Sequence, residues 1–342
     1  MKHYAAFYRG DKHFSVESVP EHQPGPGEVA VDVAFVGICG TDMHVFHGNM
    51  DARVGLNRII GHEMSGVIGA IGPEVEGFSE GDRIVVRPLH PCDTCAACKR
   101  GLAHLCYNLK FLGLDTDGAM QRRWIVPAFT LHRLPEGVGL DVAAMVEPLA
   151  VAVHDVRRAR LKPGETALVI GGGPIGMLIA MVARAEGANV VLSEINESRL
   201  AMAAEMGFQG VNPKNANVAE TVLESTNGAG ADVVFEVSGT QSGVDLMTEA
   251  VRARGRIVMV AIHATKPQVD LFRFFWREIE MFGARVYEPD DYDRAIEMIA
   301  QGLPISELIT DRHSLAQVQA AFDALDGNPN AMKSLIEIGG AQ

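Results

Sequence analysis

The sequence predicts an α/β protein of two domains, a β-rich domain followed by a doubly wound parallel sheet. Residues 1 to about 150 contain many glycines and prolines and short alternating runs, such as 28–36 and 83–86, which are typical of antiparallel strands joined by turns. From residue 166 onwards, continuous apolar runs alternate with helical segments, which indicates a parallel sheet covered on both faces. With 342 residues, the chain is also longer than one hydrophobic core usually supports.

Strands and helices are predicted along the rest of the chain, and the last of them are expected to belong to the first domain. After residue 287, two amphipathic helices are predicted over 291–301 and 315–325, the second entered through a capping box of Ser314 and Gln317. A last strand over 334–338 follows, and we expect this segment to return to the first domain. The elements predicted before it are strand 167–170, helix 175–186, strand 190–192, helix 197–206, strand 233–237, helix 243–253, strand 257–261 and strand 279–282.

The charge and the distribution of apolar residues indicate which kind of partner the protein binds. The net charge is −13, and the 30 basic residues are scattered, which argues against nucleic acid or an anionic membrane as a partner. No apolar run is long enough to span a bilayer, and none at the start is typical of a signal peptide. We therefore expect a cytoplasmic protein with reduced thiols and a small-molecule ligand.

Four of the five cysteines form one short run. Cys92, Cys95, Cys98 and Cys106 follow a Cys-x2-Cys-x2-Cys-x7-Cys pattern, whose thiolates can surround zinc at about 2.3 Å. Two disulfides are the alternative, but such crowding in a long chain is unlike a small secreted domain. A site of four thiolates is coordinatively full, so the sequence predicts a structural zinc there and chemistry elsewhere.

A glycine-rich turn predicts a dinucleotide site. Gly171, Gly173 and Gly176 fit Gly-x-Gly-x-x-Gly between a strand and a helix, where bare backbone can approach a pyrophosphate. Glu194 ends the next strand and can bind the ribose hydroxyls, which favours NAD over NADP. Nearby Arg199 could be mistaken for a phosphate clamp, and we include it among the cofactor candidates. Alternatively, Glu194 only caps the following helix.

The remaining cysteine belongs to a second candidate metal site. Cys39 lies in a Gly-Ile-Cys-Gly-Thr-Asp-Met-His segment, and His62 and Glu63 follow Gly61. A thiolate, an imidazole and a carboxylate give zinc three protein ligands and leave one position open, as a catalytic zinc requires.

Together these motifs resemble the zinc-dependent medium-chain dehydrogenase/reductase family along essentially the whole chain, and within it the sorbitol and xylitol dehydrogenases most. The resemblance implies a β-rich, chaperonin-10-like catalytic domain at 1–151, an NAD-binding Rossmann domain at 152–287, and a return to the catalytic domain at 288–342. It also implies one catalytic and one structural zinc. Relatives are dimers or tetramers, so a homodimer or homotetramer is expected.

The resemblance assigns roles residue by residue. Cys39, His62 and Glu63 match the catalytic zinc ligands, and Asp42 matches the acid that orients a ligating imidazole. Thr41 matches the hydroxyl that hydrogen-bonds the substrate alcohol, and His44 matches the histidine that passes its proton to solvent. Glu147 is then a fourth or water-mediated ligand, or else a carboxylate favoured by a helix N-terminus.

The implied reaction is oxidation of a secondary alcohol of a polyol or sugar-derived substrate to a ketone, with NAD+ as acceptor. The arginine of Gly283-Ala284-Arg285-Val286-Tyr287 stands one place away from the branch's Arg-Tyr pair, so the substrate pocket differs. L-Threonine and butanediol dehydrogenase are alternatives, and His90 weakly matches a threonine dehydrogenase histidine. Zinc-free quinone reductases and non-catalytic nucleotide-binding proteins are alternatives of another class, against which the complete set of metal-ligand residues argues.

Overall fold

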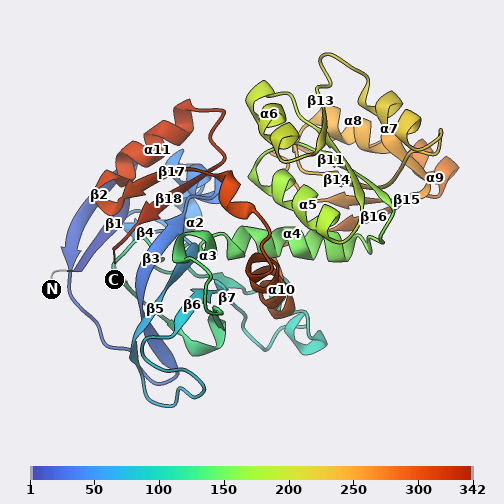
Figure 1. The fold of residues 1–342 in the computed structure, drawn as a ribbon. Coiled ribbons are helices and arrows are strands. Elements are labelled where there is room, and N and C mark those ends of the chain that lie inside the picture. The colour runs from blue at the N-terminus through green and yellow to red at the C-terminus, as the bar shows by residue number, and fades with distance from the viewer. Residues whose placement is uncertain (1–2, 340–342) are drawn as a thin grey trace. The chain divides into compact units, whose positions relative to one another are not determined.

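The computed structural model describes residues 3–339, and the chain forms two compact units (Figure 1). The first unit comprises Met1–Pro148 and Glu288–Gln342, and the second comprises Leu149–Tyr287. Both contain helices and strands, so the predicted α/β class is confirmed. Within 3–339, the structure contains no helix with the length and apolar character that crossing a membrane requires.

A seven-stranded sheet forms the centre of the first unit. Six strands run in the order β10-β6-β5-β3-β18-β17, and β9 pairs with β3. The last strand returns to this sheet, because β18 pairs antiparallel with β3 and parallel with β17. These strands are β3 (Glu28–Gly37), β5 (Glu63–Ile71), β6 (Arg83–Val86), β9 (Arg123–Pro127), β10 (Leu131–Arg133), β17 (Ile309–Ser314) and β18 (Lys333–Glu337).

Two smaller sheets complete the β structure of this unit. One has the order β2-β1-β4 and the other pairs β7 with β8. The aromatic rings of Phe14, Phe46 and Phe322 pack together in the buried core. The strands are β1 (His3–Gly10), β2 (His13–Val19), β4 (Arg58–Ile59), β7 (Leu89–His90) and β8 (Lys110–Phe111), and the α-helices are α1 (Gly40–Phe46), α2 (Asp51–Val54), α3 (Leu140–Ala143), α10 (Pro289–Ala300) and α11 (Val318–Gly327).

The second unit is built on a six-stranded parallel sheet, which confirms the doubly wound prediction. Its order, β13-β12-β11-β14-β15-β16, changes direction between β11 and β14, and a dinucleotide binds at that point in folds of this type. The strands are β11 (Thr166–Ile170), β12 (Asn189–Ser193), β13 (Gln209–Val211), β14 (Ala231–Glu236), β15 (Val251–Met259) and β16 (Glu280–Gly283), and the helices are α5 (Pro174–Ala185), α6 (Glu197–Glu205), α7 (Val218–Ser225), α8 (Gln241–Ala250) and α9 (Leu271–Arg277). Helix α4 (Val146–Arg158) begins at the end of the first unit's N-terminal segment.

Two predicted helices differ from the structure. The helix predicted over 243–253 ends at Ala250, because Val251 turns extended and pairs with Ala231 at the start of β15. Sheet pairing there outweighs the helix propensity of the Ala and Arg residues that follow. The helix predicted over 315–325 starts as a 3-10 turn and becomes α-helical at Val318, although the capping box of Ser314 and Gln317 is present.

Candidate active site

The structure brings the three predicted ligands of the second metal site together. The ligand atoms of Cys39, His62 and Glu63 lie within 4.8 Å of one another. His62 and Glu63 are buried, and Cys39 is partly buried. Glu147 is not in this group of three, although it is buried on α4 and its charge acts on Lys333.

Local structure explains how Cys39 is presented. It is the N-cap of α1, and its Sγ accepts a hydrogen bond from the backbone N–H of Thr41 at 3.4 Å. Asp42 completes the cap, because its Oδ2 accepts from the Cys39 N–H at 2.9 Å. The Cys39 thiol therefore lies at the N-terminus of a short helix, where its Sγ accepts a backbone N–H. Thr41 and His44 follow on the same helix, and His44 is exposed.

A glycine makes room for the carboxylate of Glu63. Gly37 on β3 pairs with Glu63 on β5, and a Cβ at position 37 would lie 2.3 Å from Glu63 Oε2. Such contacts do not occur, so any side chain at position 37 would displace the carboxylate.

The imidazole of His62 lies next to two groups that can carry negative charge, Asp42 and Cys39. Its Nδ1 lies 3.6 Å from Asp42 Oδ1, which is longer than a hydrogen bond, and neither atom has a hydrogen-bond partner among the described residues. Burial opposes a charged imidazole, but Asp42 and Cys39 outweigh it and raise the pKa of His62. A cation is therefore favoured beside Cys39, either as a proton on His62 or as a metal ion.

Lys333 is a participant that sequence reasoning missed. Its Nζ lies 2.6 Å from Glu63 Oε2 and 3.3 Å from the carbonyl oxygen of Ile38, and both charged side chains are buried. Burial alone would lower the pKa of Lys333, but Glu63, Cys39 and Glu147 raise it, so the ammonium stays charged. Lys333 therefore neutralises the Glu63 carboxylate inside the unit.

The four cysteines of the short loop also converge. Their ligand atoms form a second group within 4.8 Å, and sulfur–sulfur distances are 3.4 Å for Cys92–Cys106, 3.5 Å for Cys95–Cys98 and 3.9 Å for Cys95–Cys106. A zinc tetrahedron with bonds of about 2.3 Å has sulfurs roughly 3.8 Å apart, whereas a disulfide needs about 2.05 Å. All four are free cysteines, so the disulfide alternative is not supported.

Neighbouring groups stabilise charge on part of this cluster. The hydroxyl of Thr94, with Asn108, lowers the pKa of Cys92 to about 5. Burial and the adjacent sulfurs of Cys95 and Cys106 raise the pKa of Cys98 to about 12. Four thiolates cannot all form without a cation among them, which is the expected behaviour of a metal-binding set.

Replacing Cys98 with serine is expected to remove one zinc per chain and to lower the free energy of unfolding by about 3 kcal/mol, because closing a loop of this length is worth about that much. Metal analysis and denaturant unfolding measure both effects. Wild-type protein treated with a chelator serves as the control. A Cys98→Ser protein that keeps its metal content and its unfolding midpoint would contradict the assignment.

In the second unit, each motif glycine shows its own constraint. Gly171 has φ +105°, a conformation that favours glycine, and a Cβ there would lie 3.2 Å from the Ser238 backbone. Gly173 is the N-cap of α5, and a Cβ there would lie 3.6 Å from Arg199 Nη1. A Cβ on Gly176 would lie 1.8 Å from the carbonyl oxygen of Gly171. The turn therefore has the geometry of a pyrophosphate-binding loop.

Glu194 lies directly against this turn. Its Oε2 accepts from the N–H of Gly172 at 2.7 Å, and its Oε1 accepts from the N–H groups of Ile195 and Asn196. The helix that follows is capped by Asn196, not by Glu194, so the capping alternative for Glu194 is wrong. Arg199 Nη1 is 3.9 Å from Glu194 Oε2, and this weak contact offsets part of its charge.

A second acidic network at the same edge of the sheet was missed by sequence reasoning. Glu236 ends β14, and its Oε1 accepts from the N–H groups of Ser238 and Gly239. His263 Nε2 lies 3.1 Å from the other oxygen of Glu236. These groups shape the loop that faces the glycine turn through Ser238 and Gly171.

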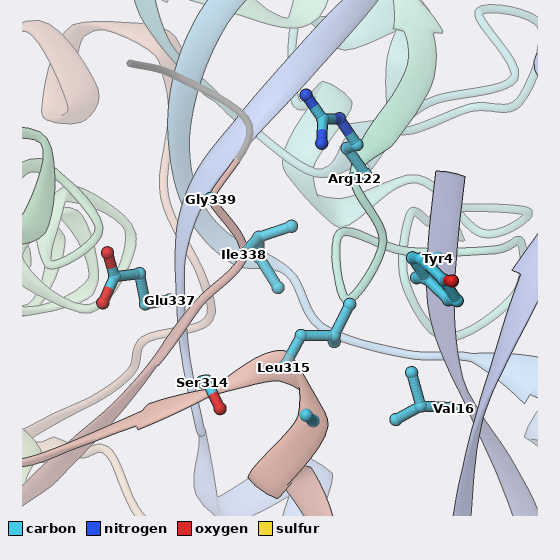
Figure 2. A pocket seen from close by; sticks show the side chains of 9 residues that line it. Tyr4, Val16, Arg122, Ser314, Leu315, Glu337, Ile338 and Gly339 are labelled. Atoms are coloured by element: carbon cyan, nitrogen blue, oxygen red, sulfur yellow. The ribbon is translucent and has the colours of Figure 1, made fainter. Parts of the chain in front are cut away.

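A separate apolar pocket of about 440 Å³ lies in the first unit. Figure 2 shows Leu315 and Ile338 at its centre, Tyr4 and Val16 on one side and Arg122 above them. None of its lining residues belongs to either metal-ligand group.

A β-rich unit with two converging metal-ligand sets, joined to a dinucleotide-type sheet, defines a metal-dependent dehydrogenase. The chain belongs to the zinc-binding dehydrogenase family: residues 25–136 match the alcohol dehydrogenase GroES-like domain, and residues 174–301 match the zinc-binding dehydrogenase domain. It is therefore an oxidoreductase enzyme, and the resemblance seen in the sequence is confirmed.

Three similar proteins illustrate the range of the family. The 2-dehydro-3-deoxy-L-galactonate 5-dehydrogenase of Pseudoalteromonas atlantica is 53% identical over 340 residues, covering 99% of this chain and all of the relative. The L-idonate 5-dehydrogenase of Vitis vinifera is 31% identical, covering 98% and 94%. The solved alcohol dehydrogenase of Escherichia coli CFT073, complexed with NADH, is 26% identical with a TM-score of 0.91, covering 99% and 100%.

Proposed function

We propose that the enzyme oxidises a secondary hydroxyl of a sugar-derived acid to a ketone, with NAD+ as the hydride acceptor. The observation that carries the proposal is the convergence of the ligand atoms of Cys39, His62 and Glu63 within 4.8 Å of one another. The sugar-acid class is supported by the whole-length similarity to a 2-dehydro-3-deoxy-L-galactonate 5-dehydrogenase and an L-idonate 5-dehydrogenase.

The residues present fit a catalytic zinc. A thiolate, an imidazole and a carboxylate are a donor set that zinc prefers. Beside this set lie Asp42 Oδ1 and His62 Nδ1, which have no hydrogen-bond partner within residues 3–339. When bound, zinc supplies Lewis acidity that lowers the pKa of a coordinated hydroxyl. Cys39, His62 and Glu63 would hold this zinc, and the Lys333 ammonium restrains the Glu63 carboxylate through Oε2.

Thr41 and His44 provide the route for the substrate proton in this proposal. The hydroxyl of Thr41 stands on the first turn of α1, next to the ligand Cys39, and His44 follows three residues later on the same helix. Side chains three residues apart share a helix face, so a proton that leaves the substrate hydroxyl can pass from Thr41 towards the exposed imidazole of His44.

The cofactor proposal depends on Glu194. In this proposal the glycine turn binds the pyrophosphate of the cofactor. The Glu194 carboxylate beside Gly172 binds the ribose hydroxyls of NAD+ and repels the 2′-phosphate of NADP+. A solved relative with NADH bound supports a nicotinamide cofactor.

Replacing Glu194 with glutamine is expected to shift the ratio of kcat/KM for NADP+ over NAD+ upward at least tenfold, or about 1.4 kcal/mol. Glutamine can still accept from Gly172 but carries no charge, and it leaves Arg199 free to meet a phosphate. Initial rates with both cofactors measure the ratio. Glu197→Gln, on an exposed residue of α6, should leave it unchanged. An unchanged ratio in Glu194→Gln would disprove the discriminating role.

A substrate panel tests the proposed reaction. The panel contains 2-dehydro-3-deoxy-L-galactonate, L-idonate, sorbitol, xylitol, (R,R)-butanediol and L-threonine, each with NAD+, with NADH formation followed by absorbance and zinc counted per chain. We expect two zincs and the highest kcat/KM for a sugar acid. Preferred turnover of L-threonine or butanediol would support the alternative dehydrogenases instead, and turnover without zinc would support the zinc-free class.

We also propose a homo-oligomer formed through the second unit. Helix α9 exposes Leu271, Phe272, Phe275 and Trp276, with Trp276 72% exposed, and it contacts β15, the neighbour of the edge strand β16 (Figure 1). Such an apolar patch in a unit whose sheet ends in an edge strand is typical of a protein–protein contact, and a second copy offers the same strand for isologous pairing.

Light scattering is expected to give two or four times the chain mass of 36.8 kDa. Phe272→Glu combined with Trp276→Glu should lower this mass, because charges would be buried in the contact. Phe129→Glu replaces an exposed phenylalanine of the first unit and should not change it. A wild-type monomer would refute the proposed assembly.

A further inference from the structure

The metal-ligating ring of His62 is contacted by a turn whose own fold depends on an ion pair. The ring of Phe111 lies edge-on to His62, with centroids 5.2 Å apart and planes 86° apart. Because Asp42 is too far from His62 for a good hydrogen bond, packing carries much of the ring's orientation.

Asp115 closes the turn that carries Phe111. Its Oδ2 accepts from the Phe111 N–H at 2.8 Å, and its own N–H donates to the Phe111 carbonyl at 2.8 Å. The same carboxylate receives a bidentate pair from Arg53 on α2, with Nε–Oδ1 and Nη2–Oδ2 both at 2.8 Å. Two parallel charge-assisted hydrogen bonds fix both distance and orientation.

The turn also rests on the backbone that carries His62. A Cβ on Gly113 would lie 2.3 Å from the carbonyl oxygen of Gly61 and 3.3 Å from His62 Cβ. A Cβ on Gly118 would lie 2.4 Å from that same oxygen, and Ala119 donates its N–H to it at 2.9 Å. Gly113 of the turn therefore packs directly against the backbone of Gly61, so a shift of the turn is expected to move the neighbouring residue His62.

We propose that Asp115 and Arg53 are positioning residues for the catalytic metal: their ion pair holds the turn 111–115 so that Phe111 keeps the His62 imidazole in its coordinating orientation. This inference rests on the proposed zinc site of Cys39, His62 and Glu63. The proposal links an exposed ion pair, whose two residues are 62 positions apart in the sequence, to the orientation of a buried zinc ligand.

The test measures zinc affinity in the full-length, zinc-loaded protein by competition with a chelating dye. Asp115→Asn should weaken the binding of one of two zincs about tenfold, as the loss of partners that orient a ligand commonly does. Arg53→Lys, which keeps the charge but not the bidentate geometry, should weaken it less and provides a second variant if Asp115→Asn folds poorly.

A matched control is available in the same unit. Arg123 and Asp32 form another bidentate pair, with Nε–Oδ1 at 2.7 Å and Nη2–Oδ2 at 3.0 Å, and neither belongs to a metal-ligand group. Asp32→Asn should leave both zinc affinities unchanged. Equal affinities in Asp115→Asn and wild type would overturn the proposal.

Combining Asp115→Asn with two other substitutions distinguishes positioning of His62 from a general loss of order in the first unit. In Phe111→Ala, adding Asp115→Asn should cause no further loss, because both act through one ring; additive losses would overturn the proposal. In Cys39→Ala, the remaining zinc reports the four-cysteine loop, and Asp115→Asn should not weaken it; weakening there would show a loop effect and overturn the proposal. Failure of the proposed zinc site itself is distinguishable, because wild type would then hold a single zinc.

Discussion

Alanine at Cys39 or at His62 is expected to lower kcat/KM at least about a thousandfold while NADH still binds. Loss of a Lewis acid removes several kcal/mol of transition-state stabilisation, and about 1.4 kcal/mol corresponds to each factor of ten. The glycine turn and Glu194 belong to a different unit of the chain, so they keep their geometry. Turnover of the best panel substrate measures kcat/KM, fluorescence titration measures NADH binding, and zinc counting shows whether the catalytic zinc is lost.

His47→Ala is the matched control for His62→Ala. His47 follows α1 and pairs with Asp326, but it is not part of a metal-ligand group, so its replacement should change kcat/KM little. Zinc content should fall from two to one in the Cys39 and His62 variants only. Undiminished turnover in either variant would refute a metal-assisted reaction at this site.

Lys333→Met is expected to destabilise the protein by about 3–5 kcal/mol, the usual consequence of removing one partner of a buried ion pair. The substitution keeps the apolar stem but leaves the buried Glu63 carboxylate without its cation, beside Cys39 and Glu147. Denaturant unfolding of metal-free protein measures the loss, since a bound metal would supply replacement charge.

Two variants make the Lys333 prediction sharp. Lys12→Met breaks an exposed pair with Asp326 and should cost less than about 1 kcal/mol. Adding Glu63→Gln to Lys333→Met should recover much of the stability, because both charges are then gone. The prediction fails if Lys333→Met costs no more than Lys12→Met, or if Glu63→Gln brings no recovery.

Motifs written in short stretches of sequence were predictable. The four cysteines span only 15 residues, and the glycine turn is bounded by a strand and a helix, so local spacing sufficed to predict both. The alternation of apolar strands with helices likewise predicted the parallel sheet that the structure shows. In each case the signal and the structure it predicts occupy the same stretch of chain.

Contacts between distant residues were not predictable. Lys333 reaches Glu63 across 270 positions, and nothing around a lysine at the start of a strand distinguishes it from a solvated one. Gly37 lies in a strand and not in a turn, so the sequence gives no local reason for a glycine there. Its role in leaving room for the Glu63 carboxylate follows only from the strand register that places it opposite Glu63. The helix predicted to reach 253 failed for the same reason, because the pairing of Val251 with Ala231 is a tertiary contact.

The position of Lys333 in β18 has a consequence for synthesis of the chain. The strand that supplies this ammonium is the last strand within residues 3–339, and it lies between β3 and β17 in the sheet. A nascent chain that has emerged only as far as α11 holds Glu63 and Cys39 without the Lys333 ammonium and leaves residues 35–37 of β3 without their β18 partners. The proposed zinc site therefore lacks its buried counter-charge until β18 has been synthesised, so chains truncated before β18 hold Glu63 without Lys333.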